Sequence, residues 1–518
     1  MNTQTIQLAE IFQSGMVLQR DKQLHFYGTA TPESNVSVKI YSKDMTLSPV
    51  EGVCKADETG RFLATLPPHS AGSGFHITVS CNDSIVTLEQ ISFGDIWLAG
   101  GQSNMEFFLK YEKNWETTKT LPVNPDIHMF NFPQRAFEGH HSHNRYGYGY
   151  WFCADDEGFD MFSAPGFSFA KELQEDLNIP IGIIGCNWGG STASAWVPED
   201  VLKDEKLVRY LNEYDMEIRD KDPEALKQES LKAWAFEDTK EHWEQFEPLL
   251  YGRDYDWQMQ YVKEHAGDPQ HPMGPYNMNR PSGLYHNMLK KLIPFSIKGV
   301  IWYQGESDSG DRAPMYDTLM TKLIEDWRKE WQDDFPFIMV QLAPFGKWLE
   351  CGNDGYAVVR AQQQKVADHL KDVYLATIMD LGSYYDIHPK EKMEVGRRLA
   401  LLAKGHVYGE PILCDSPRAK SASVSGHDIT VTFDFADGLY KTDAPSDFKV
   451  MVNGNTFVPD KIQVVDDKVI LTVNNLLISS NDSASVALAI ENYSQVNIFN
   501  KAGLSAAPFD IRINNITI

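Results

Sequence analysis

The stretch that decides the fold runs from Gly94 to Glu106 and reads Gly-Asp-Ile-Trp-Leu-Ala-Gly-Gly-Gln-Ser-Asn-Met-Glu. Its first half is an apolar run typical of a buried strand, and the paired glycines Gly100 and Gly101 end that run. Glycine adopts backbone angles that other residues reach only with strain, so the chain can turn sharply here. In open α/β sheets ligands bind at the carboxyl ends of the strands, where the residue after such a turn lies. The pattern makes Ser103 a candidate nucleophile, and a serine that caps the next helix is the plainer alternative.

Two later stretches contain the groups that a serine nucleophile needs. Residues 301–307 again form an apolar strand that ends in glycine with polar neighbours, Gln304 and Glu306. Residues 386–389 read Asp-Ile-His-Pro and place His388 close to a carboxylate, just before a helix-like segment. Acyl transfer requires a nucleophile, a base and an orienting group. The three stretches together therefore predict a site for acyl transfer.

The middle of the chain predicts an α/β domain with a parallel sheet. From about residue 93 apolar strands alternate with helical segments, as in parallel sheets with crossover helices. The predicted strands are 96–99, 181–186, 298–303, 337–342 and 374–379, and the predicted helices are 167–177, 284–292, 315–330, 360–371 and 392–404. The candidate catalytic residues follow the ends of predicted strands, where α/β proteins bind ligands. This agreement between the predicted fold and the motifs is the strongest argument from the residues alone.

Two β domains are predicted to flank the α/β domain. Residues 1–92 and 411–518 both alternate apolar and polar residues with a period of two, between turn-forming clusters. A packing role is expected for the second of these domains, and a sugar-binding module is the alternative. Within the α/β domain, residues 198–281 form a charged insertion rich in Trp and Tyr. We expect it to be helical and exposed, and long insertions often border a substrate pocket or form a partner surface.

The composition excludes several classes of function. A formal net charge of −25 argues against nucleic acid and anionic membrane surfaces as partners. The sequence has no run of about 18 apolar residues, so no membrane span is predicted. The chain starts without a basic and apolar leader pattern, and we expect a cytoplasmic protein; an exported form whose leader has been removed is the alternative. The oligomeric state is not predicted.

The cysteines and histidines do not predict a metal site. The six cysteines lie far apart without a Cys-x-x-Cys pair, a spacing that favours neither a zinc site nor a disulfide framework. Residues 140–143 read His-His-Ser-His, and we expect a solvated loop because the spacing does not suit one helix face. We therefore expect neither a metal nor a cofactor.

Three segments together resemble the sequence blocks of the sialate O-acetylesterase family, within the SGNH (GDSL-like) hydrolases. They are Gly-Gln-Ser-Asn-Met at 101–105, Trp-Tyr-Gln-Gly-Glu at 302–306 and Asp-Ile-His-Pro at 386–389. Gly-Met-Val-Leu-Gln-Arg at 15–20 resembles the family's N-terminal signature, and the likeness covers most of residues 7–405. It implies an SGNH-hydrolase three-layer α/β/α domain at 93–410, flanked by β-sandwich-like domains.

The resemblance also implies roles for the catalytic residues. Ser103 is the nucleophile, His388 is the general base and then the acid, and Asp386 orients the histidine. The broader group has its acid three residues before the histidine, where this chain has Tyr385. Asp380, Glu306 or a plain Ser–His dyad are therefore the alternatives to Asp386.

The oxyanion hole and the substrate contacts follow from the same resemblance. The expected donors are the backbone N–H of Ser103, one of Gly189 and Gly190, and the side chain of Gln304. A glycine turn and a buried amide bonded to the backbone are the plainer alternatives for these last three. Expected substrate contacts are made by Gln102, Asn104, Glu306 and Arg360; for Arg360, which precedes Gln362 at a helix start, an ion pair on the helix surface is the alternative.

The sequence thus predicts a serine esterase that removes O-acetyl groups from sialic acid through an acyl-enzyme. An acetylxylan esterase acting on neutral plant glycans is one alternative, and a non-catalytic carbohydrate-binding protein on a hydrolase scaffold is the other. Because the chain is acidic, an anionic sugar also requires a local basic group at the site.

Overall fold

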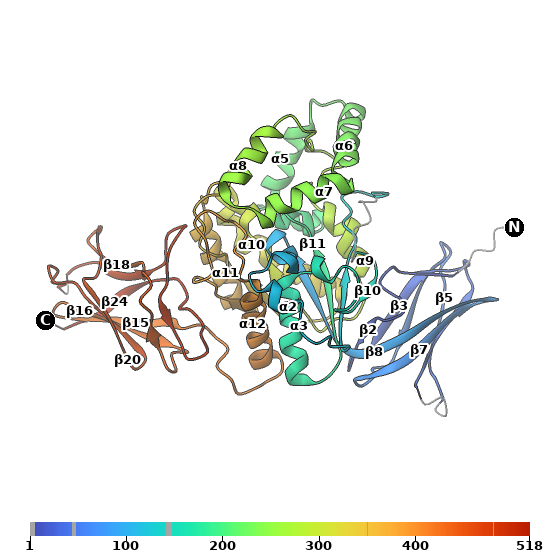
Figure 1. Ribbon diagram of the computed structural model, residues 1–518, viewed down its shortest axis with the longest axis horizontal. Coiled ribbons are helices and arrows are strands. Elements are labelled where there is room, and N and C mark those ends of the chain that lie inside the picture. Colours follow the sequence, from blue (N-terminus) through green and yellow to red (C-terminus); the bar gives the residue numbers. More distant parts are fainter. Residues whose placement is uncertain (1–5, 44–47, 141–147, 350, 480, 518) are drawn as a thin grey trace. The chain divides into compact units, whose positions relative to one another are not determined.

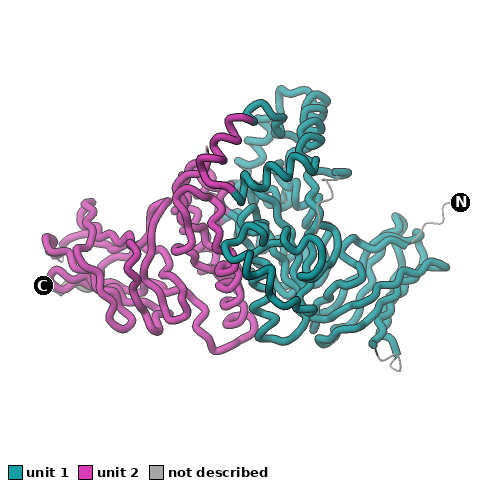
Figure 2. The backbone as a smooth tube through the Cα atoms, viewed as in Figure 1, with its two compact units in different colours: residues 1–252, 265–304, 318–337 teal, residues 253–264, 305–317, 338–518 magenta. Residues whose placement is uncertain are grey.

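The computed structural model describes residues 6–43, 48–140, 148–349, 351–479 and 481–517. The chain divides into two compact units (Figure 2). Unit 1 comprises residues 1–252, 265–304 and 318–337, and unit 2 comprises residues 253–264, 305–317 and 338–518.

The first part of unit 1 is built from strands with alternating burial. They are β1 (Gln7–Leu8), β2 (Val17–Gln19), β3 (Leu24–Thr29), β4 (Asn35–Tyr41), β5 (Val50–Lys55), β6 (Arg61–Leu66), β7 (Gly72–Cys81) and β8 (Ser84–Gly101). β3 pairs with β1 and β6, while β4 pairs with β5 and β7, all antiparallel. The strand character that the period-two alternation predicts for this region is confirmed.

The long strand β8 connects these strands to a parallel sheet (Figure 1). It pairs antiparallel with β7 up to Phe93, and from Asp95 it pairs parallel with β11 (Ile181–Asn187). β12 (Gly299–Tyr303) lies parallel on its other side, and β9 (Ile127–Asn131) lies parallel to β11. β10 (Trp151–Phe152) pairs antiparallel with β9. Every residue of β11 and β12 is buried, as expected for parallel strands covered on both faces.

The helices of unit 1 include most of the predicted insertion. They are α1 (Ser103–Glu106), η1 (Leu109–Tyr111), α2 (Trp115–Thr118), η2 (Phe159–Met161), α3 (Ala164–Leu177), η3 (Ala193–Trp196), α4 (Glu199–Leu202), α5 (Val208–Ile218), α6 (Pro223–Glu237), α7 (Lys240–Glu247), η4 (Pro248–Gly252), η5 (Tyr285–Leu289), α9 (Lys290–Leu292) and α10 (Tyr316–Trp331), whose first two residues belong to unit 2. Ser163 caps α3 because its Oγ accepts a hydrogen bond from the Gly166 N–H at 3.0 Å. α3 then packs on β9 and β11.

Unit 2 contains the remaining α/β elements. They are α8 (Tyr255–Glu264), η6 (Glu306–Asp308), η7 (Gly310–Met315), β13 (Phe337–Val340), whose first residue belongs to unit 1, α11 (Tyr356–His369), β14 (Val373–Ala376), α12 (Lys392–Leu402) and η8 (Ala403–Val407). α11 and α12 both pack on β14. The helices predicted at 360–371 and 392–404 are confirmed, with α11 starting earlier and the second ending as the π-helix η8.

The C-terminal part of unit 2 is a β structure with its own core. Its strands are β15 (Arg418–Ser425), β16 (Asp428–Asp434), β17 (Tyr440–Lys441), β18 (Phe448–Val452), β19 (Asn455–Phe457), β20 (Lys461–Val465), β21 (Lys468–Thr472), β22 (Ala484–Leu488), β23 (Ile498–Phe499) and β24 (Phe509–Thr517). Eight of them form one sheet in the order β19-β18-β22-β24-β15-β16-β21-β20, and β17 pairs with β23. Alternate residues such as Val431, Val450 and Leu471 are buried in this core. The predicted strands here are confirmed.

Candidate active site

Ser103 lies directly after the end of β8, as predicted. Gly101 has a φ of 130°, and a Cβ at this position would overlap the carbonyl oxygen of Tyr303 on the neighbouring β12, so the turn requires glycine. The Gln102 N–H donates to that carbonyl oxygen at 3.0 Å. Gln102 occupies the cap position of α1, and Ser103 is the first helical residue with 7% of its surface exposed. The alternative in which Ser103 is the cap is therefore wrong.

The glycine segment after β11 packs against Ser103. The Trp188 N–H donates to the Gly101 carbonyl oxygen at 3.1 Å, which joins the ends of the two strands. A Cβ built at Gly189 would lie 3.2 Å from the Cβ of Ser103, so this backbone approaches the candidate nucleophile closely. Gly190 has a φ of 75°, in the left-handed region that favours glycine. The structure thus brings Gly189 and Gly190 to the turn that carries Ser103.

Glu106 connects the nucleophile turn to the glycine segment. Its carboxylate is buried, with 6% of the residue exposed. Oε2 accepts a hydrogen bond from the Gly189 N–H at 2.7 Å, and Oε1 accepts one from Gln134 Nε2 at 2.9 Å. Hydrogen bonds to an ionised acceptor are stronger than neutral ones. The sequence analysis missed Glu106, although residues three apart on a helix lie on one face and Glu106 follows Ser103 by three.

Gln304 is buried and contacts the segment that follows β11. Its side-chain Nε2 donates to the Ser191 carbonyl oxygen at 3.2 Å. Ser191 Oγ in turn donates to the Trp188 carbonyl oxygen at 2.7 Å and accepts from Trp196 Nε1 at 3.1 Å. A carboxamide has two N–H donors. The bond to the Ser191 carbonyl oxygen uses one of them, as the alternative of a buried amide bonded to the backbone predicts. Gln304 therefore fixes the segment that follows Gly190.

His388 belongs to unit 2 and lies in the segment between β14 and α12. It is buried, with 2% of its surface exposed, and its ring packs edge-to-face with that of Trp348, 5.3 Å apart between centroids. Trp348 Nε1 donates to Gln258 Oε1 at 2.8 Å, and Gln258 lies on α8 in the predicted insertion. The insertion thus holds Trp348, the aromatic residue that packs on the candidate base. The predicted helical character of the insertion is confirmed.

The predicted orienting acid shapes the turn that carries His388. Asp386 Oδ1 accepts a hydrogen bond from the backbone N–H of His388 at 2.8 Å, and Oδ2 lies 3.3 Å from Lys390 Nζ. Burial lowers the pKa of Lys390, while its neighbour Asp386 opposes that shift. The role of Asp386 as the acid partner of the imidazole stays a prediction.

The two alternative acids have different surroundings. Both carboxylate oxygens of Asp380 accept from the guanidinium of Arg398, at 2.6 and 2.7 Å, in a bidentate ion pair. Such a pair occupies Asp380 and makes it a poor partner for His388. Glu306 lies in η6 with 9% of its surface exposed.

The predicted substrate contacts are mostly buried. Gln102 and Asn104 have 3% and 1% of their surfaces exposed. The Arg360 side chain is also buried, and its guanidinium donates to the backbone carbonyl oxygens of Glu491 and Asn492. Burial lowers the pKa of Arg360 to about 10. The helix-surface ion pair considered for Arg360 is therefore wrong, and its contacts favour a role in holding the chain near residue 491.

A lysine held between two tyrosines lies beside the histidine segment, and the sequence analysis missed it. Lys347 Nζ lies 5.5 Å from the ring centroid of Tyr255 and 5.4 Å from that of Tyr385. Lys347 is exposed, and 52% of Tyr385 is exposed. Lys347 directly precedes Trp348, which contacts His388. The Lys347 N–H donates to the Tyr384 carbonyl oxygen at 2.7 Å, and the ring of Tyr255 on α8 meets that of Tyr385 at 5.5 Å between centroids. No sequence motif indicates these contacts.

The histidine tract is only partly described. Residues 141–143 lie outside the described part of the chain. His140 is buried: its Nδ1 accepts from the Ala136 N–H at 3.1 Å and its Nε2 lies 2.9 Å from Asp238 Oδ2. The expectation of a solvated loop is therefore wrong for His140, because Asp238 and the ring of Trp234 cover it.

Comparisons with known proteins show the family to which the chain belongs. Residues 93–233 and 273–403 match the model of a family described as carbohydrate esterase, sialic acid-specific acetylesterase. The sialate O-acetylesterases of Homo sapiens and Mus musculus are both 24% identical to this chain, and each match covers 71–72% of the relative. For these two proteins, 78% and 76% of this chain are aligned.

A solved structure extends the likeness to nearly the whole chain. The crystal structure of a carbohydrate acetylesterase from Xanthomonas citri has a TM-score of 0.74 and is 26% identical. The likeness covers 98% of this chain and 99% of that one. Among the residues described here, no helix is both long and apolar enough to span a lipid bilayer.

Proposed function

Since the chain belongs to the carbohydrate esterase family of sialic acid-specific acetylesterases, we propose that it removes O-acetyl groups from sialic acid by serine catalysis. It is a carboxylic ester hydrolase by this membership. The observation that carries the proposal is Ser103 at the end of β8, with the Gly189 backbone packed against it and tied to Glu106.

The proposed reaction has two steps. Ser103 Oγ attacks the acetyl carbonyl carbon while His388 takes the hydroxyl proton, and the carbonyl oxygen becomes an oxyanion. The bond from the carbonyl carbon to the sugar oxygen then breaks, and His388 returns the proton to that oxygen. Water next attacks the acetyl-Ser103 ester with His388 as base, which releases acetate and restores the serine.

The oxyanion is proposed to bind to backbone N–H groups of the two strand ends. Because the Gly189 N–H donates to Glu106, we assign the second donor to Gly190, beside the N–H of Ser103. The side chain of Gln304 is the proposed third donor. The loss of one such donor raises the barrier by about 3 kcal/mol.

Lys347 is the basic group proposed to meet the carboxylate of sialic acid. The chain as a whole has a charge of −25, so an anionic sugar needs local positive charge. Lys347 is exposed between Tyr255 and Tyr385, and tyrosine rings offer apolar faces with polar ends to a sugar. This observation favours sialic acid over a neutral glycan.

We further propose that the α/β region forms the three-layer α/β/α domain of SGNH hydrolases at 93–410, flanked by β-sandwich-like domains at 1–92 and 411–518. The change of partner of β8 from β7 to β11 between Phe93 and Asp95 supports the first boundary. The separate core of the C-terminal strands supports the second.

The test compares acetate release from 9-O-acetylated sialic acid and from acetylated xylo-oligosaccharide. We expect faster release from the sialic acid, and a loss of about 10⁴-fold or more in Ser103→Ala. Ser425→Ala, which changes an exposed serine of β15, should leave the rates unchanged. Faster release from the xylan fragment would move the substrate to neutral glycans. Release from neither, or full activity in Ser103→Ala, would contradict the proposal.

A further inference from the structure

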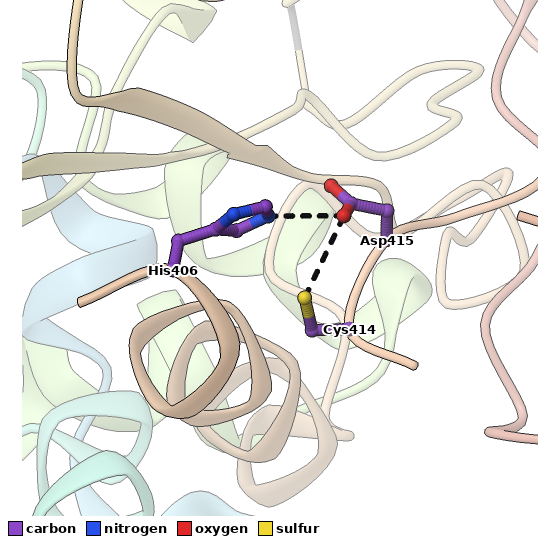
Figure 3. Close-up of side chains that lie close together, drawn as sticks. All are labelled: His406, Cys414 and Asp415. Atoms are coloured by element: carbon purple, nitrogen blue, oxygen red, sulfur yellow. Dashed lines mark hydrogen bonds and ion pairs between the residues drawn. The ribbon is translucent and has the colours of Figure 1, made fainter. Parts of the chain in front are cut away.

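Among the residues that the structure describes, three different metal-ligating side chains gather in unit 2 outside the proposed active site (Figure 3). They are His406, Cys414 and Asp415. His406 Nε2 lies 2.9 Å from Asp415 Oδ2, and Cys414 Sγ lies 3.5 Å from the same oxygen. The imidazole nitrogen, the sulfur and the carboxylate oxygen all lie within 4.8 Å of one another.

Packing holds His406 toward the other two residues. It lies in the π-helix η8 that continues α12, and short π-helical segments often occur at functional sites. Its ring stacks on Tyr374 of β14, with the centroids 4.3 Å apart and the planes 6° apart. A stacked ring is restricted in rotation, so Nε2 stays directed at Asp415.

Packing also holds the segment of Cys414 and Asp415. Gly405, next to His406, allows the sulfur to approach, because a Cβ at this position would overlap Cys414 Sγ. Asn500 Nδ2 donates to the backbone carbonyl oxygen of Asp415 at 2.9 Å. The two sides of the cluster are thus fixed by independent contacts.

We propose that His406, Cys414 and Asp415 bind one zinc ion. Neighbouring ligand atoms around a tetrahedral zinc ion are about 3.3 to 3.6 Å apart. The separations of 2.9 and 3.5 Å lie close to this range, and the third, between the His406 nitrogen and the Cys414 sulfur, is within 4.8 Å. Magnesium and calcium prefer sets of oxygen ligands, whereas a mixed set of nitrogen, sulfur and oxygen suits zinc.

The site has an entry path and a fourth position. The side chains of His406 and Asp415 are 30% and 25% exposed, so the ion can enter from solvent and water can complete its coordination. Cys414 is buried and forms the inner wall. Zinc would join η8 at the end of α12 to the segment that precedes β15. Such a link is structural and is independent of the proposed esterase reaction.

An ion pair between His406 and Asp415 is the simpler explanation of their contact. An ion pair alone does not explain why the Cys414 thiol lies on the same carboxylate oxygen. Nor does it explain why residue 405 is a glycine, which leaves room for the sulfur. The two explanations differ in the role of Cys414, because only a metal site makes this sulfur a ligand. No metal was expected from the sequence because the cysteines lie far apart without a Cys-x-x-Cys pair. The spacing of His406 and Cys414, eight positions apart, also matches no common zinc motif.

The experiment uses the full chain, stripped with a chelator and desalted. Zinc is titrated against a chromophoric competitor, and cobalt(II) serves as the spectroscopic probe because a thiolate ligand gives a charge-transfer band in the near ultraviolet. We expect one equivalent of zinc per chain and a cobalt–thiolate band. Cys414→Ser should lose the band, and Asp415→Asn, which keeps the side-chain shape, should weaken zinc binding about ten-fold or more.

Cys351→Ser is the matched control, since it changes an exposed cysteine of the same unit. It should bind zinc and cobalt as the unchanged chain does. If Cys414→Ser does not fold, Asp415→Asn and His406→Gln decide the test. The proposal is overturned if the unchanged chain retains no stoichiometric zinc, or if these variants bind it with unchanged affinity. Acetate release should be the same with and without zinc, so a failed zinc site and a failed esterase assignment are distinguishable.

Discussion

Glu106 controls the geometry around Ser103. It is a buried carboxylate whose two oxygens accept from the Gly189 N–H and from Gln134. Since Gly189 packs on Ser103, a shift of this hydrogen bond displaces the backbone that borders the oxyanion. We therefore predict that Glu106 is a positioning residue, which acts through Gly189 and does not itself contact the substrate.

Replacement of Glu106 by Gln tests this role. Glutamine has only one acceptor oxygen, so its NH₂ group faces hydrogen-bond donors at the position of one carboxylate oxygen. We expect kcat to fall about 10²-fold with little change in KM, the size of effect seen when an oxyanion donor is lost. The unfolding free energy should fall by about 1 to 3 kcal/mol. Steady-state kinetics and urea denaturation measure the two effects.

Glu116→Gln is the control for this change, because its side chain is 81% exposed. It should alter neither kcat nor stability. A Glu106→Gln variant with lowered stability and unchanged kcat would show that Glu106 serves the fold alone.

At this scale the sequence predicted the position of Ser103 correctly, because a glycine turn after an apolar run depends on local backbone preferences. The bond between Glu106 and Gly189 was not predictable. It depends on the register of β8 against β11, which pairs Gly101 with Asn187. The bidentate pair of Asp380 with Arg398 was missed for a similar reason, since Arg398 lies on α12.

Among the elements, β8 shows why the sequence located strand cores better than strand ends. Its burial alternates near Ser84 and becomes continuous from Ile91 to Gly101. The first pattern is that of a strand with one exposed face, and the second is that of a buried parallel strand. Because the periodicity changes within one strand, the sequence predicted only 96–99. Similarly, the helix predicted at 284–292 is the π-helix η5 followed by α9, a hydrogen-bond pattern that propensity does not distinguish.

The contact of α8 with the loop of Lys347 leads to a prediction about substrate choice. Lys347→Met removes the charge between Tyr255 and Tyr385 and keeps the length of the side chain. We expect kcat/KM for O-acetylated sialic acid to fall about 10- to 100-fold, as for a lost charge-assisted hydrogen bond. Activity on an uncharged ester such as 4-nitrophenyl acetate should stay the same.

Lys371→Met is the control, because this lysine lies in the same unit with 90% of its side chain exposed. It removes one positive charge from the chain and should leave both activities unchanged. An equal loss on both esters in Lys347→Met would mean that the lysine supports the site in general and does not recognise the carboxylate.

On the scale of the whole molecule, the N-terminal signature at 15–20 contacts the long strand β8. β2 pairs parallel with β8, with Gln19 opposite Gly94. Gln19 Nε2 and the guanidinium of Arg20 donate to the buried carboxylate of Asp95, each at 3.0 Å. The signature therefore anchors the start of the strand segment whose other end carries Ser103. No local pattern in the sequence predicted this contact, since about 75 residues separate its partners.

The carboxylate of Asp95 makes stability depend on pH. Burial alone would raise the pKa of Asp95, but the hydrogen bonds and charge of Arg20 and the amide of Gln19 hold it below the usual value. A carboxyl group with a lowered pKa in the folded state stabilises the fold fully above its unfolded pKa of about 3.9. That contribution is lost as the pH falls below this value and through the folded pKa.

Asp95→Asn should therefore lower the unfolding free energy by about 3 kcal/mol at pH 7, because it leaves the guanidinium of Arg20 without its buried partner. The difference from the unchanged chain should shrink in urea denaturations repeated below about pH 4, where Asp95 becomes protonated in the unchanged chain as well. Asp21→Asn is the matched control: Asp21 lies 3.8 Å from the same arginine with 66% of its side chain exposed, and its loss should change stability by less than about 1 kcal/mol. A deficit in Asp95→Asn that stays constant from pH 7 to pH 3 would contradict the ionic role. Hydrogen bonding alone would then explain why an acid stands at the start of the parallel segment of β8, the strand that ends just before Ser103.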